Sequence, residues 1–185
     1  MSKNSFKTIL FDFDGVLSND RFYENMSPEY EREKSQIKEI IFQENKNNIV
    51  FEWMRGKKNY EDVHNFVRKY TNIEISIEKL NKFLKNSVKS MSLNEDILEF
   101  NTYLQNRNIE TAVFTDNMDV FDRVLVPHSS LDKKFDAIVS SAKHGLLKHD
   151  KSGKLFDIAM NKLDSNPKET LVVDDSIDLK PVVEN

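Results

Sequence analysis

An apolar run that leads directly into two aspartates constrains the fold of this chain more than any other feature. Residues 7–13, KTILFDF, have the near-continuous apolar character of a strand that is buried on both faces of a parallel sheet. Asp12 and Asp14 stand one residue apart at the end of this run, and Gly15 follows. Two carboxylates at this spacing repel each other and lose solvation when enclosed, so the pair indicates a site that binds a cation or does chemistry.

The composition argues against several classes of partner and cofactor. A formal net charge of −4, with no basic stripe, disfavours nucleic acid as the main partner. No apolar run approaches the roughly 20 residues that cross a bilayer, and the N-terminal MSKNSFK lacks the apolar core of a signal peptide. We therefore expect a cytoplasmic protein without a membrane partner. The chain has no cysteine, and its four histidines are not spaced as ligands, so a metal would need oxygen ligands, which suit Mg²⁺.

Strands and helices alternate in the second half of the chain. Asn94 has the character of a helix cap, and the helix that it starts is expected to run to about Arg107. The helix-like segment MDVFDRVLV is expected to stop before Pro127. Strands are predicted at residues 110–114, 135–141 and 170–175, and a further helix at 154–163. This alternation predicts an α/β fold with an open parallel sheet and right-handed crossovers.

Residues 21–90 have a helical pattern instead, with many charges and almost no strand signal. One helix is predicted to begin with Ser27 as its cap, a second with Asn59 and a third with Ser76. Aromatic residues at helical spacing indicate packing rather than a cofactor site, and His64 is expected on a helix surface. We therefore expect a core made of residues 1–19 and 91–185, interrupted by a helical domain of residues 20–90.

Polar residues follow three of the predicted strands. They are Asp12, Asp14, Thr115, Asp116, Asn117, Asp174 and Asp175. In open parallel sheets, ligands bind outside the carboxyl ends of the strands, so these segments are expected to meet at one edge. One pair of acids is weak evidence, but three such ends, each behind an apolar strand, indicate a shared site.

The motifs DFDGVL, VFTDN and LVVDDS, in this order and with a lysine-rich stretch before the last, resemble those of the haloacid dehalogenase (HAD) superfamily. The resemblance covers essentially the whole chain. It implies a Rossmann-like core, and the helical insertion resembles the α-helical cap that the phosphatases and β-phosphoglucomutase-like members of the family carry in the C1 position. A receiver domain also gathers acids, a threonine and a lysine at strand ends, but it has no long helical insertion after its first strand.

The resemblance implies a role for each motif residue. Asp12 would be the nucleophile that forms an aspartyl-phosphate, and Asp14 would be the general acid and then the general base. Thr115 would donate a hydrogen bond to the transferring phosphoryl group. Asp175, with Asp174 as a further candidate, would complete a Mg²⁺ site together with the Asp12 carboxylate and the Asp14 backbone carbonyl.

The phosphate-binding lysine is open at this point. Members of the family usually place it in a Lys-Pro pair shortly before a helix that contains phenylalanine, whereas LLKHDKSGKLFDIA offers Lys148, Lys151 and Lys154 without a following proline. The usual spacing from Phe156 falls on Asp150, so Lys151 is the favoured candidate and Lys148 the next. The last motif departs as well, because Asp178 stands one residue before the position where the family usually has a further acid.

The segment WMRGKKNYEDV, residues 53–63, resembles the Arg-Gly turn that C1 caps present to the active site. Arg55 and Lys57 are therefore candidates for contacting an anionic substrate. Asp116 and Asn117, which follow the predicted strand at 110–114, are further candidates for binding the substrate. The alternative is a solvated turn, since clusters of charge usually face water.

The resemblance implies a Mg²⁺-dependent phosphatase that acts on a small phosphorylated metabolite through an aspartyl-phosphate. Asp14 bears on the reaction type, because the dehalogenases that named the family do not have aspartate two residues after the nucleophile. A proton donor there is useful when an alkoxide leaves. The alternatives are a phosphomutase, which uses the same residues, and a degraded relative that binds a ligand without turnover.

Overall fold

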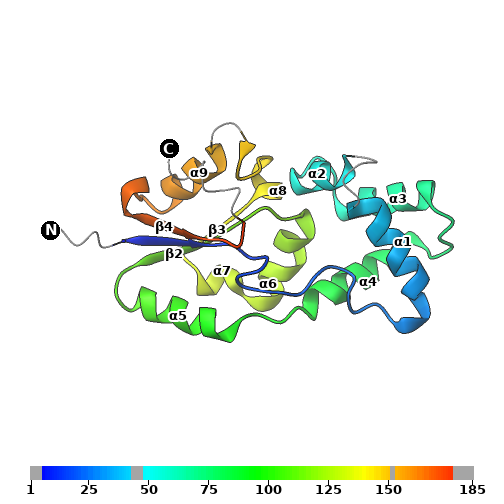
Figure 1. Cartoon of the computed structure of the whole chain (residues 1–185), viewed down its shortest axis with the longest axis horizontal. Coiled ribbons are helices and arrows are strands. Elements are labelled where there is room, and N and C mark those ends of the chain that lie inside the picture. Colours follow the sequence, from blue (N-terminus) through cyan, green and yellow to red (C-terminus); the bar gives the residue numbers. More distant parts are fainter. Residues whose placement is uncertain (1–5, 43–47, 151–152, 177–185) are drawn as a thin grey trace.

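The computed structural model describes residues 6–42, 48–150 and 153–176, and in these ranges it has one parallel sheet of four strands (Figure 1). The order across the sheet is β3-β2-β1-β4, and the register pairs Phe11 with both Val113 and Val173. The α/β fold and the parallel sheet are therefore confirmed. The strands are β1 (Thr8–Phe11), β2 (Glu110–Thr115), β3 (Ala137–Ser140) and β4 (Thr170–Val173).

Helices cover both faces of the sheet around β1, which explains why Ile9, Leu10 and Phe11 of this strand are all apolar. Leu10 packs on one face in a cluster with Leu155 from α9 (Lys154–Lys162), and Phe11 packs on the other face in a cluster with Leu104 from α5 (Glu95–Gln105). Figure 1 shows α9 on one side of the sheet and α5 on the opposite side. All four residues of β1 are buried, as expected for the inner strand of a covered parallel sheet.

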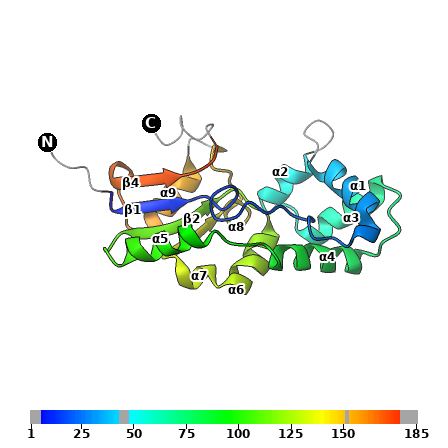
Figure 2. The ribbon, with the colours of Figure 1, turned by 60° about the horizontal axis from the view of Figure 1, so that its bottom comes forward.

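A group of helices lies beyond the carboxyl end of the sheet, and we refer to it as the helical lobe, residues 28–42 and 48–89 (Figures 1 and 2). Asn59 accepts a hydrogen bond from Asp62 N, and Ser76 accepts one from Lys79 N, so both predicted caps are confirmed. The helices of the lobe are α1 (Glu31–Phe42), α2 (Ile49–Met54), α3 (Tyr60–Tyr70) and α4 (Ile77–Lys89).

The first of these helices begins at the predicted residue, but through a 3₁₀ turn. Ser27 holds the N-cap position of the turn Pro28–Tyr30, which leads directly into α1. The predicted start is therefore confirmed, whereas the serine side chain makes no capping hydrogen bond, and Tyr30 N bonds to Ser27 O at 2.9 Å.

Pro127 does not end its helix, contrary to the prediction. The π-helical turn Phe121–Leu125 continues into α6 (Val126–Ser129), and the amide of Val126 bonds back to Phe121 O. The proline thus lies in the first turn after a widened segment, where a missing N–H donor is tolerated. A short helix, α7 (Leu131–Lys134), follows before β3, and α8 (Ser141–His144) follows β3.

Asp119, just after the end of β2, joins the helical lobe to the sheet. Its Oδ1 accepts a hydrogen bond from Trp53 Nε1 at 2.6 Å and one from the backbone amide of Tyr60 at 3.1 Å. On the neighbouring turn, a Cβ on Gly56 would lie 2.2 Å from Ala142 O, so only glycine permits this close approach. These contacts set the position of α2 and α3 relative to the strand ends. In the described ranges, no helix is both long and apolar enough to span a membrane.

His64 is fully buried, so its predicted place on a helix surface is wrong. Its Nδ1 donates to Asn81 Oδ1 at 2.5 Å, and its Nε2 accepts from Tyr23 OH at 2.8 Å. Since an amide oxygen only accepts, this pairing assigns the imidazole proton to Nδ1. The position follows from the spacing, because His64 shares a helix face with Tyr60 and Val67, which are also buried.

Burial lowers the pKa of His64, and a pH dependence of stability follows. The unfolded chain protonates this imidazole near pH 6.5, whereas the folded protein resists protonation until lower pH. The free energy of unfolding should therefore decrease as the pH falls from about 6.5 towards the folded pKa, by at most about 1.4 kcal/mol per pH unit.

Chemical denaturation of wild type and His64→Gln between pH 7 and pH 5 tests this dependence. The variant should be less stable at pH 7 but should lose less stability on acidification, while the carboxylates contribute equally to both proteins. The same exchange at exposed His128 controls for the loss of one imidazole. Parallel pH profiles for wild type and His64→Gln would contradict the assignment.

Candidate active site

The carboxyl ends of β1, β2 and β4 meet because these three strands are neighbours in the sheet. The backbone amide of Asp12 bonds to Val173 O at 2.9 Å, which carries the pairing of β1 with β4 one residue past the end of β1. Asp174 and Thr115 are thereby placed on either side of Asp12. This edge faces the helical lobe (Figure 1).

A buried lysine links the first and last motifs. Lys148 Nζ lies 2.9 Å from Asp12 Oδ1 and 2.5 Å from Asp174 Oδ2, and the exposed fractions of Lys148 and Asp12 are 4% and 7%. Burial raises the pKa of Asp12, although the Lys148 ammonium opposes that effect. An ammonium at this position offsets the enclosure of two carboxylates, and it is the positive charge that the site needs for an anionic ligand.

The lysine at the site is thus Lys148, the second of the sequence candidates. The favoured candidate, Lys151, lies outside the described residues. The backbone amide of Lys148 donates to Asp116 Oδ1 at 2.9 Å, so the residue after Thr115 fixes the loop that carries the lysine. The spacing from Phe156 could not identify Lys148, because a count of residues does not show which backbone contacts position the loop.

Asp12, Asp174 and Asp175 form the acidic cluster of the site. Each offers a carboxylate oxygen, and these oxygens lie within 4.8 Å of one another. Three hard oxygen donors that would otherwise repel one another are a suitable ligand set for Mg²⁺, so the residues fit such an ion. Asp178, the further acid of the last motif, lies outside the described residues.

Gly15 makes room for the cluster. Its φ is +78°, and a Cβ added there would lie 2.1 Å from Asp175 Oδ2, far inside van der Waals contact. The glycine of the first motif therefore serves two purposes, since it adopts the left-handed conformation and admits the Asp175 carboxylate beside β1.

Asp14 lies apart from this cluster and faces the space between the sheet and the helical lobe. Its Oδ2 accepts from Asn117 Nδ2 at 3.1 Å, and its Oδ1 pairs with Arg21 Nη1 at 3.2 Å. The side chain is 39% accessible, but many protein atoms lie close to it and displace part of its water. This desolvation is the larger cause, and the charge of Asp12 the next, of a rise in its pKa to about 6. The predicted metal contact of Asp14 concerns its backbone carbonyl and stays a prediction.

Thr115, the last residue of β2, brings a hydroxyl without a partner to the site. Its side chain is fully buried, and within the described ranges Oγ1 has no hydrogen-bond partner. A buried hydroxyl is costly unless it is paired, so this atom points to a ligand that accepts a hydrogen bond there. A phosphoryl oxygen meets that requirement.

Asp116 and Asn117 have different surroundings from those predicted for substrate contacts. Asn117 is 1% exposed, and its amide group is used within the protein, with Nδ2 on Asp14 and Oδ1 accepting from Met118 N at 2.9 Å. It therefore orients Asp14. Asp116 holds the Lys148 backbone and also lines the cavity beside Asp14, and burial raises its pKa to about 6.

Arg55 and Lys57 line a separate cavity of about 390 Å³ with Leu147 and His149. Arg55 forms a two-pronged ion pair with Asp150, with Nε–Oδ2 and Nη2–Oδ1 distances of 2.9 Å and 2.7 Å. This guanidinium holds the pKa of Asp150 down at about 2. The pair connects the turn after α2 to the loop of Lys148. The Arg55 guanidinium is therefore bound to Asp150, and it does not line the cavity next to Asp14.

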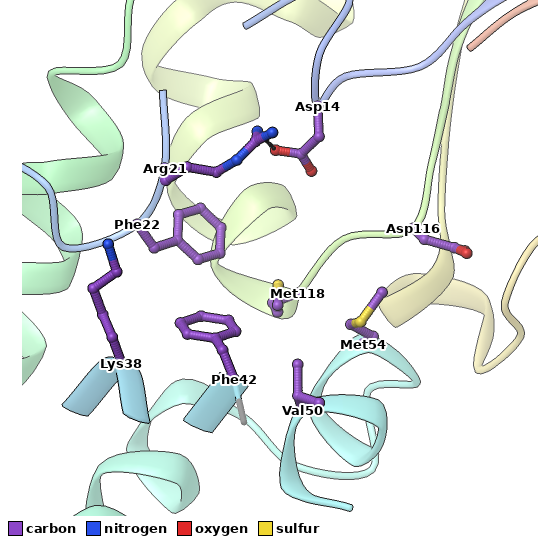
Figure 3. A pocket seen from close by; sticks show the side chains of 9 residues that line it. All are labelled: Asp14, Arg21, Phe22, Lys38, Phe42, Val50, Met54, Asp116 and Met118. Atoms are coloured by element: carbon purple, nitrogen blue, oxygen red, sulfur yellow. Dashed lines mark hydrogen bonds and ion pairs between the residues drawn. The ribbon is translucent and has the colours of Figure 1, made fainter. Parts of the chain in front are cut away.

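A cavity of about 400 Å³ lies between Asp14 and the helical lobe, and we refer to it as the Asp14 cavity (Figure 3). No sequence pattern indicates this cavity, because its five apolar residues come from four separate segments and each fits an ordinary packing pattern. The lining consists of Asp14, Arg21, Phe22, Lys38, Phe42, Val50, Met54, Asp116 and Met118.

Many solved structures share this fold. One of them, described as a predicted HAD-like family hydrolase from Porphyromonas gingivalis, has 18% identity and a TM-score of 0.73, over 97% of this chain and 86% of that chain. An HAD family enzyme from Bacteroides thetaiotaomicron, solved with magnesium and inorganic phosphate, has 18% identity and a TM-score of 0.68, over 97% of this chain and 90% of that chain. The L-2-haloacid dehalogenase from Xanthobacter autotrophicus, with chloropropionic acid covalently bound, has 16% identity and a TM-score of 0.66, over 97% of this chain and 74% of that chain.

Identities this low support the fold alone, and curated protein sequences gave no match. A family model gives the assignment. The model for haloacid dehalogenase-like hydrolases matches residues 6–178, which include all the strand ends described above. The chain therefore belongs to the haloacid dehalogenase-like hydrolase family.

Proposed function

We propose that this hydrolase is a Mg²⁺-dependent phosphatase that cleaves a small phosphomonoester through a phosphoryl group on Asp12. The observation that carries the proposal is the placement of Asp14. Its carboxyl faces the Asp14 cavity, is oriented by Asn117 and has a raised pKa, as a group that gives a proton to a leaving oxygen requires.

In the first step, an Asp12 carboxylate oxygen forms a bond to phosphorus while the bond from phosphorus to the leaving oxygen breaks. The Lys148 ammonium, 2.9 Å from Asp12 Oδ1, and the unpaired Thr115 hydroxyl are available to hold the phosphoryl oxygens. Mg²⁺ held by Asp12, Asp174 and Asp175 would offset the repulsion between the carboxylate nucleophile and the anionic phosphate.

Asp14 serves both half-reactions in this proposal. It donates its proton to the leaving oxygen, so that an alcohol departs rather than an alkoxide. It then takes a proton from a water molecule that attacks phosphorus, which releases phosphate and restores the Asp12 carboxylate. Arg21 and Asn117 hold the two carboxyl oxygens of Asp14 and keep the group directed at the cavity.

A dehalogenase is the alternative that the fold admits, since the dehalogenase from X. autotrophicus shares it. A halide leaves as an anion and needs no proton, so the proton donor Asp14 favours ester cleavage. The phosphate and magnesium in the B. thetaiotaomicron enzyme support the same choice. A degraded, inactive relative is disfavoured because the nucleophile, the acid, the lysine and the acidic cluster are all in place.

Hydrolysis of p-nitrophenyl phosphate with and without metal tests the proposal. With Mg²⁺ the protein should release p-nitrophenol, EDTA should abolish the reaction, and excess Mg²⁺ should restore it. Chloride release from 2-chloropropionate, measured in the same preparation, should stay at background. Turnover that is unaffected by EDTA, or chloride release without phosphate release, would overturn the assignment.

A further inference from the structure

The Asp14 cavity is placed to hold the part of a substrate that leaves. Asp14 lies at its boundary, and the cavity extends from there to α1 and α2 of the helical lobe, as Figure 3 shows. In the proposed function, Asp14 gives its proton to the leaving oxygen. The group attached to that oxygen therefore occupies the space beyond Asp14, while the phosphoryl group lies near Asp12.

The walls of this space are mostly apolar. Figure 3 shows Phe22, Phe42, Val50 and Met54 around the cavity, with Met118 on the strand side. These side chains are two aromatic rings, two thioethers and one branched alkyl group, none of which forms strong hydrogen bonds. They come from both the sheet side and the helical lobe, so a ligand between them would meet apolar surface on opposite sides.

The charged side chains of the lining already have partners within the protein. Arg21 pairs with Asp14 at 3.2 Å, and Lys38 Nζ lies 2.5 Å from Glu24 Oε1. Asp116 accepts the backbone amide of Lys148 at 2.9 Å. The two cations of the lining are thus each paired with a carboxylate, which weakens their attraction for a second acidic group on the substrate.

We infer that the substrate is a phosphomonoester whose leaving group is an apolar alcohol or phenol, rather than a sugar or another polyol. This inference rests on the proposed function, because that function places the leaving group in the cavity. An apolar group of up to roughly ten heavy atoms fits a cavity of about 400 Å³ and gains by leaving water, whereas each buried sugar hydroxyl loses its hydrogen bonds.

Cyclohexylmethyl phosphate and glucose 6-phosphate form a matched test pair. Both have a six-membered ring and a primary alcohol as the leaving group, and they differ in polarity. With Mg²⁺ present, kcat/KM for cyclohexylmethyl phosphate should exceed that for glucose 6-phosphate at least about tenfold. Electron withdrawal makes the sugar the better leaving group, so this preference would have to come from binding.

Two near-isosteric variants connect the preference to the cavity. Val50→Thr and Met54→Gln should each lower the ratio of the two kcat/KM values roughly threefold to tenfold, mainly by raising KM for cyclohexylmethyl phosphate. Val126→Thr, a half-buried helical position outside the cavity, is the control and should keep the wild-type ratio.

The corresponding phosphonates separate this inference from the proposed function, because they bind without being cleaved. The two probes are cyclohexylmethylphosphonate and 6-deoxy-6-phosphonoglucose. In calorimetry with Mg²⁺, the first should bind at least about tenfold more tightly than the second, with a negative heat-capacity change. That result would show that the Asp14 cavity selects an apolar group even if no ester is hydrolysed and the proposed function fails. Equal or tighter binding of the sugar phosphonate, or a higher kcat/KM for glucose 6-phosphate, would overturn the inference while leaving phosphatase activity intact.

Discussion

Asp12→Asn is expected to lower the rate of phosphomonoester hydrolysis at least about 10⁴-fold, because an amide cannot act as the nucleophile that accepts the phosphoryl group. The fold should persist, since asparagine has the same shape and the ion pair of Lys148 with Asp174 remains, at 2.5 Å. Steady-state rates with p-nitrophenyl phosphate and Mg²⁺ measure the loss, and thermal unfolding checks that the variant is folded.

The matched control is Asp157→Asn, an exposed aspartate in the first turn of α9. It removes one exposed carboxylate that has no contact with the acidic cluster or the Asp14 cavity among the described contacts, and it should keep the wild-type rate. After a short incubation with labelled substrate, acid-quenched wild type should also retain phosphate that Asp12→Asn does not. A folded Asp12→Asn variant with a near wild-type rate would refute the role of Asp12.

Gly15→Ala is expected to abolish Mg²⁺-dependent turnover for a steric reason. The new Cβ would lie 2.1 Å from Asp175 Oδ2, so the carboxylate must leave the acidic cluster or the first motif must shift. The variant should need a much higher Mg²⁺ concentration for any remaining activity. Titration of activity against Mg²⁺, together with direct calorimetry of Mg²⁺ binding, measures the effect.

Gly145→Ala separates this clash from ordinary backbone strain. Gly145 also has a positive φ, +71°, but the nearest atom to its added Cβ would be Arg55 O at an unstrained 3.7 Å. Each alanine should cost about 1 kcal/mol of stability for the left-handed conformation. Only Gly15→Ala should lose Mg²⁺ binding, so equal activity in the two variants would contradict the placement of Asp175.

Most of the fold was predictable because its signals are local. The apolar runs in β1, β2 and β4 made these strands recognisable, although β4 lies at the sheet edge and is only partly buried, and the caps Asn59 and Ser76 marked two helix starts. One prediction at a helix end failed, because a π-helical turn accommodates Pro127 and the helix continues past it. At the helix start at Ser27 the position was right, but the chain forms a 3₁₀ turn without a side-chain capping bond. Neither kind of turn follows from residue type alone.

The acidic part of the site was also predictable, since residues that follow parallel strands must emerge at one edge of the sheet. Residues that reach the site from loops were not. Lys148 enters because Asp116 holds its backbone, and Arg55 is diverted from the site by its ion pair with Asp150. A one-dimensional pattern records which side chains are long and charged, but it does not record which partner each of them meets.

The sequence by itself determined the strands, the order of the motifs and the carboxylates that follow them, because each depends on neighbouring residues or on the simple geometry of a parallel sheet. The tertiary structure alone decided which lysine neutralises Asp12, how Asn117 orients Asp14 and what lines the Asp14 cavity. These features depend on distances between segments far apart in the chain. Such distances are set only when the sheet and the helical lobe pack together.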